Sequence, residues 1–249
     1  IITDDEFNCA KVLTVKSDNL LAALKSGVIP VVAGFQGITE KGDITTLGRG
    51  GSDTTAAVLG EALSAFSIEI YTDVDGIMTA DPRIVPNASV LKHISYSEVF
   101  QIAEQGAKVI HPRAIEIAMR ANIPMVIKNT MNNSEGTIIS SNLVSDAGDD
   151  SIEIYNLITS ITHIKNRTQI AISNIALAAQ NKLLAEFASN GISIDLINIF
   201  PDKIIFTIDG CNSKKAGKIL ANYGFQHSII DGCSKISAIG NRIRGKPGI

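Results

Sequence analysis

The sequence of 249 residues lacks several features that mark common classes of protein. It has no excess of basic residues, because 22 lysines and arginines against 25 aspartates and glutamates give a net charge of −3, so neither a nucleic-acid nor a membrane partner is expected. Its three cysteines, Cys9, Cys211 and Cys233, are far apart and form no CxxC pair, which indicates no metal site and fits a reducing, cytoplasmic setting. No apolar run approaches the length of a membrane span, and no signal sequence is predicted.

Three familiar site motifs are also missing. No GxxxxGK[ST] run occurs, which excludes a Walker A loop. The dinucleotide fingerprint GxGxxG is not matched, because "GRGGSD" at 48–53 has aspartate where the third glycine belongs. The nucleophile elbow GxSxG is absent as well. Any ligand loop in this chain must therefore be of another kind.

Residues 1–140 alternate short apolar runs with helical patterns, which is typical of an α/β domain. A capping box, Ser95 with Glu98, begins one helix, and Pro112 suits the first turn of another. The order predicts a mostly parallel sheet with helices on both faces, whose ligands bind beyond the carboxyl ends of the strands. The expected strands are 28–37, 67–76 and 124–129, and the expected helices are 54–66, 95–107 and 112–122.

A second, smaller domain is expected at residues 158–240, after a polar and acidic linker at 141–157. Its pattern predicts strand, helix, strand, strand, helix, strand, the βαββαβ order of a ferredoxin-like unit. The expected elements are paired strand material at 158–173, helices at 176–191 and 212–224, and strands at 192–200, 203–209 and 233–241.

The loop "TTLGRGGSDTTA" at 45–56 is a candidate anion site. Glycines allow close approach of backbone amides, and the helix that follows turns its positive end toward the loop. Arg49 adds a fork of donors suited to a carboxylate or phosphate. Ser52 and Asp53 have two interpretations: they cap the helix, which the spacing alone favours, or they hold a substrate.

Four stretches in order, "GFQG" (34–37), "TTLGRGGSDTTA" (45–56), "YTDVDGIMTADPRIVP" (71–86) and "GAKVIHPRA" (106–114), resemble the aspartokinase family. That family has the amino-acid-kinase fold and carries ACT regulatory domains of βαββαβ order. The resemblance implies ATP- and Mg²⁺-dependent phosphorylation of the side-chain carboxylate of L-aspartate to 4-phospho-aspartate, the first step toward lysine, threonine and methionine. Phosphoryl transfer to a carboxylate needs positioning and charge neutralisation, which arginine, lysine and backbone amides supply.

The resemblance also implies roles for individual residues, and none is implied to bind a metal directly. Each has a simpler interpretation when taken alone: Asp73 in a turn, Lys108 at a helix end, and His111 as a packing or capping residue. The implied catalytic residues are Asp53 and Lys108, and the implied aspartate-binding residues are Arg49, Gly50, Gly51 and Ser52. The implied nucleotide-binding residues are Ser52, Thr72, Asp73, Met78, Thr79, Ala80, Asp81, Pro82, Arg83, Lys108 and Val109.

In the second domain the resemblance rests on topology and on "ISIDLI" at 192–197. It implies that Ser193, Ile194 and Asp195 bind an amino-acid effector, with lysine the first candidate and threonine the second. The simpler interpretation is that these residues only end a helix and begin a strand. ACT domains commonly pair their sheets, so a homodimer or higher homo-oligomer is expected.

Two family features have no match in this chain: a lysine- and glycine-rich segment that grips ATP, and a glutamate that holds the substrate ammonium. The end, "GNRIRGKPGI" (240–249), resembles the opening of a second ACT unit, assigned to 241–249. The chain is therefore expected to be truncated at both ends and to have negligible kinase activity alone. Two alternatives stay open: a kinase for another carboxylate such as glutamate or acetylglutamate, and a non-catalytic module that senses amino acids and dimerises.

Overall fold

The computed structural model describes residues 1–106, 109–141, 157–240 and 243. It divides into two compact units, one of Ile1–Thr162 with Ser237–Ile249 and one of His163–Ile236. Three predicted features lie wholly or almost wholly outside the described residues: the linker at 141–157, the opening of a further unit at 241–249, and Lys108. None of the helices in the described ranges is long and apolar enough to cross a membrane.

The first unit contains two four-stranded sheets with the strand orders β2-β1-β3-β4 and β5-β7-β8-β6. The strands of the first sheet are β1 (Ile2–Thr3), β2 (Val12–Thr14), β3 (Gln36–Ile38) and β4 (Ile44–Thr46). Those of the second are β5 (Ile68–Thr72), β6 (His93–Ser95), β7 (Met125–Asn129) and β8 (Thr137–Ser140). The helices are α1 (Asp18–Lys25), α2 (Gly51–Ala62), α3 (Tyr96–Glu104) and α4 (Pro112–Ala121).

The prediction of a mostly parallel sheet is only partly correct. β5 pairs with β7 and β6 pairs with β8 in parallel, but β7 and β8 are antiparallel. The connection between these two, residues 130–136, is too short for the crossover that parallel neighbours require. The first sheet is mixed too, with one parallel pair between β1 and β3.

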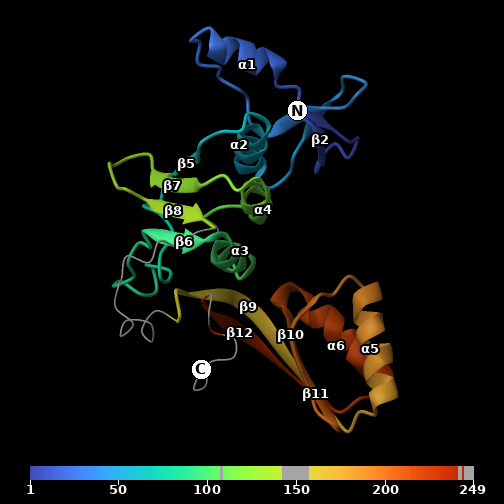
Figure 1. Cartoon of the computed structure of the whole chain (residues 1–249). Coiled ribbons are helices and arrows are strands. Elements are labelled where there is room, and N and C mark those ends of the chain that lie inside the picture. The colour runs from blue at the N-terminus through green and yellow to red at the C-terminus, as the bar shows by residue number, and fades with distance from the viewer. Residues whose placement is uncertain (107–108, 142–156, 241–242, 244–249) are drawn as a thin grey trace. The chain divides into compact units, whose positions relative to one another are not determined.

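Helices α2, α3 and α4 lie on the same side of the second sheet, rather than on both faces as predicted (Figure 1). Their inward side chains share one core with the strands, including Ala57, Ile115 and Met125, which are fully buried. α1 buries none of its side chains and so covers neither face. The predicted capping box is confirmed: Ser95 Oγ accepts from the Glu98 amide, and Glu98 Oε2 accepts from the Ser95 amide.

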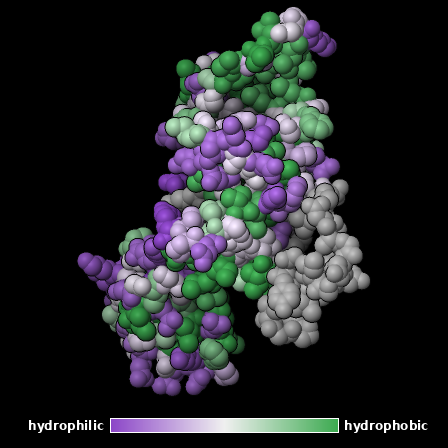
Figure 2. All heavy atoms as spheres, turned by 90° about the vertical axis from the view of Figure 1, so that its left-hand side faces the viewer, coloured by the Kyte–Doolittle hydropathy of each residue, from purple (hydrophilic) through white to green (hydrophobic). Residues whose placement is uncertain are grey.

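The prediction of a buried strand at 28–37 is wrong. Only Gln36–Ile38 forms a strand, and Ile29 and Val31 are exposed by 87% and 97%. A buried strand needs a ladder partner on each side, and in the described part of the chain none pairs with residues 28–35. In Figure 2 hydrophobic side chains gather at the end of the first unit that carries α1, where this segment lies.

The second unit is built on one four-stranded sheet with the order β10-β11-β9-β12. Residues 158–173 give one long strand rather than the predicted paired strands. Both helices end as predicted at glycines with a left-handed backbone, Gly191 (φ 68°) and Gly224 (φ 67°). The rings of Phe187 and Phe206, 5.3 Å apart and perpendicular, join helix to sheet in its core. The elements are β9 (Ser160–Ser173), α5 (Leu177–Ser189), β10 (Ile194–Ile199), β11 (Lys203–Asp209), a 3₁₀ turn η2 (Gly210–Asn212), α6 (Ser213–Tyr223) and β12 (His227–Ile239).

Candidate active site

The glycine-rich loop makes a sharp turn into α2, three residues earlier than predicted. Gly48 and Gly50 have φ values of 75° and 69°, a left-handed backbone that glycine adopts without strain. A Cβ on Gly50 would lie 2.3 Å from the His111 side chain, so only glycine fits. Gly50 is the N-cap of α2, and no side chain in the described ranges caps this helix. The Gly51 amide donates to the Gly48 carbonyl at 3.0 Å, which leaves the Ser52 and Asp53 amides of the first turn for an anion. The interpretation of Ser52 or Asp53 as the cap is wrong.

Helices α2 and α4 run side by side in the same direction (Figure 1). At their beginnings Asp53 Oδ2 accepts a hydrogen bond of 3.2 Å from the His111 amide. Toward their ends Arg120 Nη2 lies 2.8 Å from Glu61 Oε2. The two N-termini thus meet at the glycine loop, where both helix dipoles favour negative charge.

The first turn of α4 supports the loop. His111 caps α4 by accepting from the Arg113 amide on Nδ1 at 3.3 Å, which confirms the capping interpretation of this histidine. Arg113 donates from Nη1 to the Leu47 carbonyl at 2.9 Å and from Nη2 to the Ala10 carbonyl at 3.4 Å. Burial, together with the nearby Arg113 charge, lowers the pKa of His111, so its ring is neutral at pH 7. The sequence did not reveal the Arg113 bonds, which join segments far apart along the chain.

The side chains of Arg49 and Ser52 are exposed beside this turn, and Asp53 is half-buried. Gly34 lies against Ser52, because a Cβ there would be 3.6 Å from Ser52 Oγ. The motifs "GFQG" and "GRGGSD" therefore meet in space. All five residues predicted from the second motif, Arg49 to Asp53, sit at the open N-terminus of α2.

The predicted nucleotide residues Thr72 and Asp73 lie where β5 ends. Thr72 Oγ1 donates to Asp73 Oδ1 at 3.2 Å. Two residues on, Asp75 accepts hydrogen bonds from the side-chain amides of Asn129 and Asn132, at the end of β7 and just beyond it. These bonds lower the pKa of Asp75, so it is ionised at neutral pH. The carboxyl ends of two parallel strands thus meet at one edge, as the sequence predicted for a ligand site, but the two asparagines were missed.

The segment Met78–Arg83 leaves the sheet after a short contact with residues 89 and 90. Met78 forms an isolated antiparallel bridge with Val90, and the Thr79 amide donates to the Ser89 carbonyl at 2.9 Å. Arg83 forms a two-bonded ion pair with Asp81, at 3.0 Å from Nε and 2.8 Å from Nη2, while its side chain stays 87% exposed. Ala80 and Pro82 complete this segment, and Val109 is half-buried against the core of the unit.

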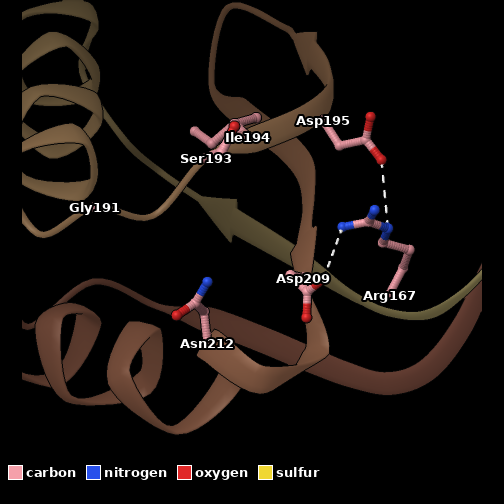
Figure 3. Close-up of a pocket in the computed structure, with 7 residues that line it drawn as sticks. All are labelled: Arg167, Gly191, Ser193, Ile194, Asp195, Asp209 and Asn212. Atoms are coloured by element: carbon pink, nitrogen blue, oxygen red, sulfur yellow. Dashed lines mark hydrogen bonds and ion pairs between the residues drawn. The ribbon is translucent and has the colours of Figure 1, made fainter. Parts of the chain in front are cut away.

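The second unit has its own pocket of about 360 Å³ (Figure 3). The three predicted effector residues line it, at the start of β10, so their proximity is seen while their role remains a prediction. Arg167 from β9 points toward Asp195 and Asp209, with its Nε 3.5 Å from Asp195 Oδ2 and its Nη1 3.4 Å from Asp209 Oδ2. The lining residues are Arg167, Gly191, Ser193, Ile194, Asp195, Asp209 and Asn212.

Charges in this pocket are already paired. Asp195 Oδ1 also accepts from Lys235 Nζ at 2.6 Å, so it meets two cations. Asp209 keeps a side-chain exposure of 48%, and hydrogen bonds from Cys211 together with Arg167 lower its pKa. Asp209 is thus more accessible than Asp195. Nothing in the sequence of β11 indicated that this strand would bring Asp209 beside Asp195.

Comparisons with known proteins agree with the motifs. The amino acid kinase family model matches residues 1–129. Aspartokinase 1 of Bacillus subtilis (strain 168) is 44% identical over 250 residues, which cover 100% of this chain and 61% of the relative. The chain thus spans about three fifths of the length of that curated relative.

Two solved structures of aspartokinase III from E. coli are similar over nearly the whole chain. The complex with lysine and aspartate (T-state) has a TM-score of 0.76 and 28% identity, over 96% of this chain and 55% of that one. The complex with aspartate and ADP (R-state) has a TM-score of 0.73 and 29% identity, over 100% and 57%. The chain belongs to the amino acid kinase family, and these relatives within it are aspartokinases.

Proposed function

We propose that this chain is part of an aspartokinase, which transfers the γ-phosphoryl group of ATP to the side-chain carboxylate of L-aspartate. The observation that carries the proposal is the uncapped N-terminus of α2 behind a glycine loop that admits no Cβ at Gly50. Such an end binds carboxylate and phosphate groups through its amides. The identity of 44% with Aspartokinase 1 of Bacillus subtilis along the whole chain supports aspartate as the acceptor.

In this proposal the exposed Arg49 pairs with a carboxylate of aspartate, while Gly50, Gly51 and Ser52 shape the pocket. Asp53, which is bonded to the His111 amide, organises the transfer centre from a fixed position. Because the acceptor carboxylate and the phosphate are both anionic, neutralising their repulsion is the main task of the site. Arg49 and the two converging helix ends provide positive potential for it.

ATP is the phosphoryl donor in this proposal, and aspartokinase III of E. coli, solved with aspartate and ADP, supports that choice. Thr72, Asp73, Val109 and the segment Met78–Arg83 would hold the nucleotide, together with Lys108. Arg83 is 87% exposed and would exchange Asp81 for a phosphate. Mg²⁺ would arrive with the nucleotide and supply charge neutralisation at its phosphates.

Residues 158–240 form an ACT regulatory domain in this proposal. The βαββαβ element order and the sheet order β10-β11-β9-β12 support a ferredoxin-like unit. Ser193, Ile194 and Asp195 would contact an amino-acid effector, with lysine first because aspartokinase III of E. coli is described in complex with it. Pairing of such domains would give a homodimer or higher oligomer, and the free thiols Cys9, Cys211 and Cys233 are compatible with the cytoplasm.

The test is an acceptor panel. The full-length protein that carries this sequence is given ATP and Mg²⁺ with aspartate, glutamate or N-acetylglutamate, and release of ADP is followed. We expect release with aspartate and at most a small fraction of it with the other two. A preference for glutamate or N-acetylglutamate would replace aspartate as the substrate. For residues 1–249 alone we expect negligible turnover, and robust aspartate-dependent release would refute that part.

A second candidate, a sensor without catalysis, is favoured by the pocket of the second unit, which is lined entirely by that unit's own residues. Calorimetry separates the two functions. A sensor binds lysine or threonine but neither aspartate nor ADP, whereas a kinase binds all of its substrates.

A further inference from the structure

A hydrogen-bond network joins the ends of β5 and β7. Asp75 Oδ1 accepts from Asn129 Nδ2 at 2.7 Å and from Asn132 Nδ2 at 2.8 Å. A single carboxylate oxygen therefore holds two side-chain amides that come from the end of β7 and the segment after it. The charge on Asp75 strengthens both bonds.

The segment after β7 is folded so as to present these amides. Asn129 Oδ1 accepts from the Met131 amide at 2.8 Å, and Asn132 Oδ1 accepts from the Ser134 amide at 2.9 Å. Each asparagine thus bonds the backbone two residues ahead, the geometry of an Asx-turn. Because both side-chain oxygens are occupied in this way, both NH₂ groups are left to face Asp75.

The same segment also anchors Thr72. The Thr130 amide donates to the Thr72 carbonyl at 2.8 Å, and Thr130 Oγ1 donates to that carbonyl at 3.0 Å. Thr72 and Asp75 are thus both tied to residues 129–132, with Asp73 between the two anchors. The turn that follows β5 is held at both of its ends.

We propose that Asp75 is a positioning residue for the nucleotide, acting through the turn that carries Thr72 and Asp73. This inference rests on the proposed function, which assigns nucleotide binding to these two residues. In this role Asp75 bonds to the two asparagines and would act on the nucleotide only through the turn. Since Oδ1 alone accepts both bonds, an acceptor oxygen at this position is what the turn requires first, and the negative charge strengthens the bonds that this oxygen makes.

The experiment compares Asp75→Ala with Asp75→Asn in the full-length protein that carries this sequence. Asparagine keeps one acceptor oxygen, whereas alanine removes it. We expect D75A to raise the KM for ATP about tenfold, the effect of losing a hydrogen bond to a charged group. The KM for aspartate and kcat should stay within about twofold, and D75N should raise the KM for ATP clearly less than D75A does, because asparagine keeps an acceptor oxygen for both bonds. Asn133→Ala, an exposed neighbour outside the network, is the control.

Several results would overturn the proposal. An ATP KM in D75A equal to that of the wild type would do so, as would a D75N variant as damaged as D75A, since charge would then matter more than the acceptor. If D75A fails to fold by thermal melting, Asn132→Ala takes its place. It should raise the ATP KM severalfold, and an unchanged value would count against the inference.

Calorimetry with ADP separates this inference from the proposed function. A wild type that binds ADP but phosphorylates no aspartate defeats only the proposed function, and weaker ADP binding by D75A would still support positioning. Equal ADP affinity of D75A and wild type overturns the positioning role. A wild type that binds no ADP overturns both.

Discussion

Asp53 Oδ2 accepts a hydrogen bond from the His111 amide at 3.2 Å, and this bond ties the first turn of α2 to the first turn of α4. It spans residues 58 positions apart and brings the "GRGGSD" and "GAKVIHPRA" motifs together. Because both helices begin there, the positive ends of two dipoles serve one site. The proposed role of Asp53 depends on this bond, which fixes the carboxylate where the anions would meet.

Gly50→Ala should disable the loop. Its left-handed backbone alone costs an alanine about 1–2 kcal/mol, and the new Cβ would also collide with the His111 side chain. We expect a large increase in the KM for aspartate, and a melting temperature lower than that of the wild type. Gly27→Ala is the matched control, because Gly27 has φ 79° and an alanine Cβ there would meet nothing within 4 Å, so it carries the strain without the clash. Equal effects of the two substitutions would contradict the role given to His111.

His111 should titrate below its ordinary pKa of 6.5. Burial disfavours the charged ring, and Arg113 repels it. The unfolded chain therefore takes up this proton first as the pH falls, so the free energy of unfolding decreases as the pH falls below 6.5. Following the imidazole proton resonance by NMR measures the midpoint directly, and a midpoint at or above 6.5 would be inconsistent with the site. His111→Asn keeps a good N-cap residue without the titration and should flatten this dependence.

Asp195→Ala should weaken lysine binding by the second unit. Arg167 and Lys235 both face Asp195, at 3.5 and 2.6 Å, and its removal takes a carboxylate away from both cations while Arg167 keeps its contact with Asp209. A cationic ligand should then bind at least about tenfold more weakly, since a hydrogen bond to a charged group contributes roughly 1.5–3 kcal/mol.

Calorimetry with lysine tests the Asp195 prediction, with Asp231→Ala as control. Asp231 accepts from Thr168 Oγ1 at 2.6 Å in the same unit but does not line the pocket. An unchanged lysine affinity in D195A, or an equal loss of affinity in D231A, would contradict an effector site at Asp195.

Local sequence signals predicted the local structure well. The capping box at Ser95 and Glu98, Pro112 at the start of α4 and the glycine ends of α5 and α6 all involve residues within one or two turns of each other. The start of α2 was placed too late, because two left-handed glycines turn the chain before the small-residue run begins. The apolar run at 28–37 predicts a buried strand, but burial depends on neighbouring strands that the sequence of the run does not specify.

Contacts between distant segments could not be read from spacing. Arg113 bonds carbonyls 66 and 103 residues away, and Arg167 faces Asp209 only because β9 and β11 pair in that register. Asn129 ends the strand predicted at 124–129, and nothing in the spacing indicated that it and Asn132 would bond to Asp75. The order of the motifs indicated which residues lie together in the candidate site. The pairing register of the strands determines which other side chains bond to those residues.

The central claim is that aspartate receives a phosphoryl group at this glycine loop, and trapping the product tests it most directly. An acyl phosphate reacts with hydroxylamine to give a stable hydroxamate, so the full-length protein that carries this sequence is incubated with ATP, Mg²⁺, aspartate and hydroxylamine. We predict aspartyl hydroxamate in an amount equal to the ADP released, and its loss in Arg49→Ala and Asp53→Ala variants that still fold. ADP release without hydroxamate, or undiminished hydroxamate from both variants, would contradict the claim.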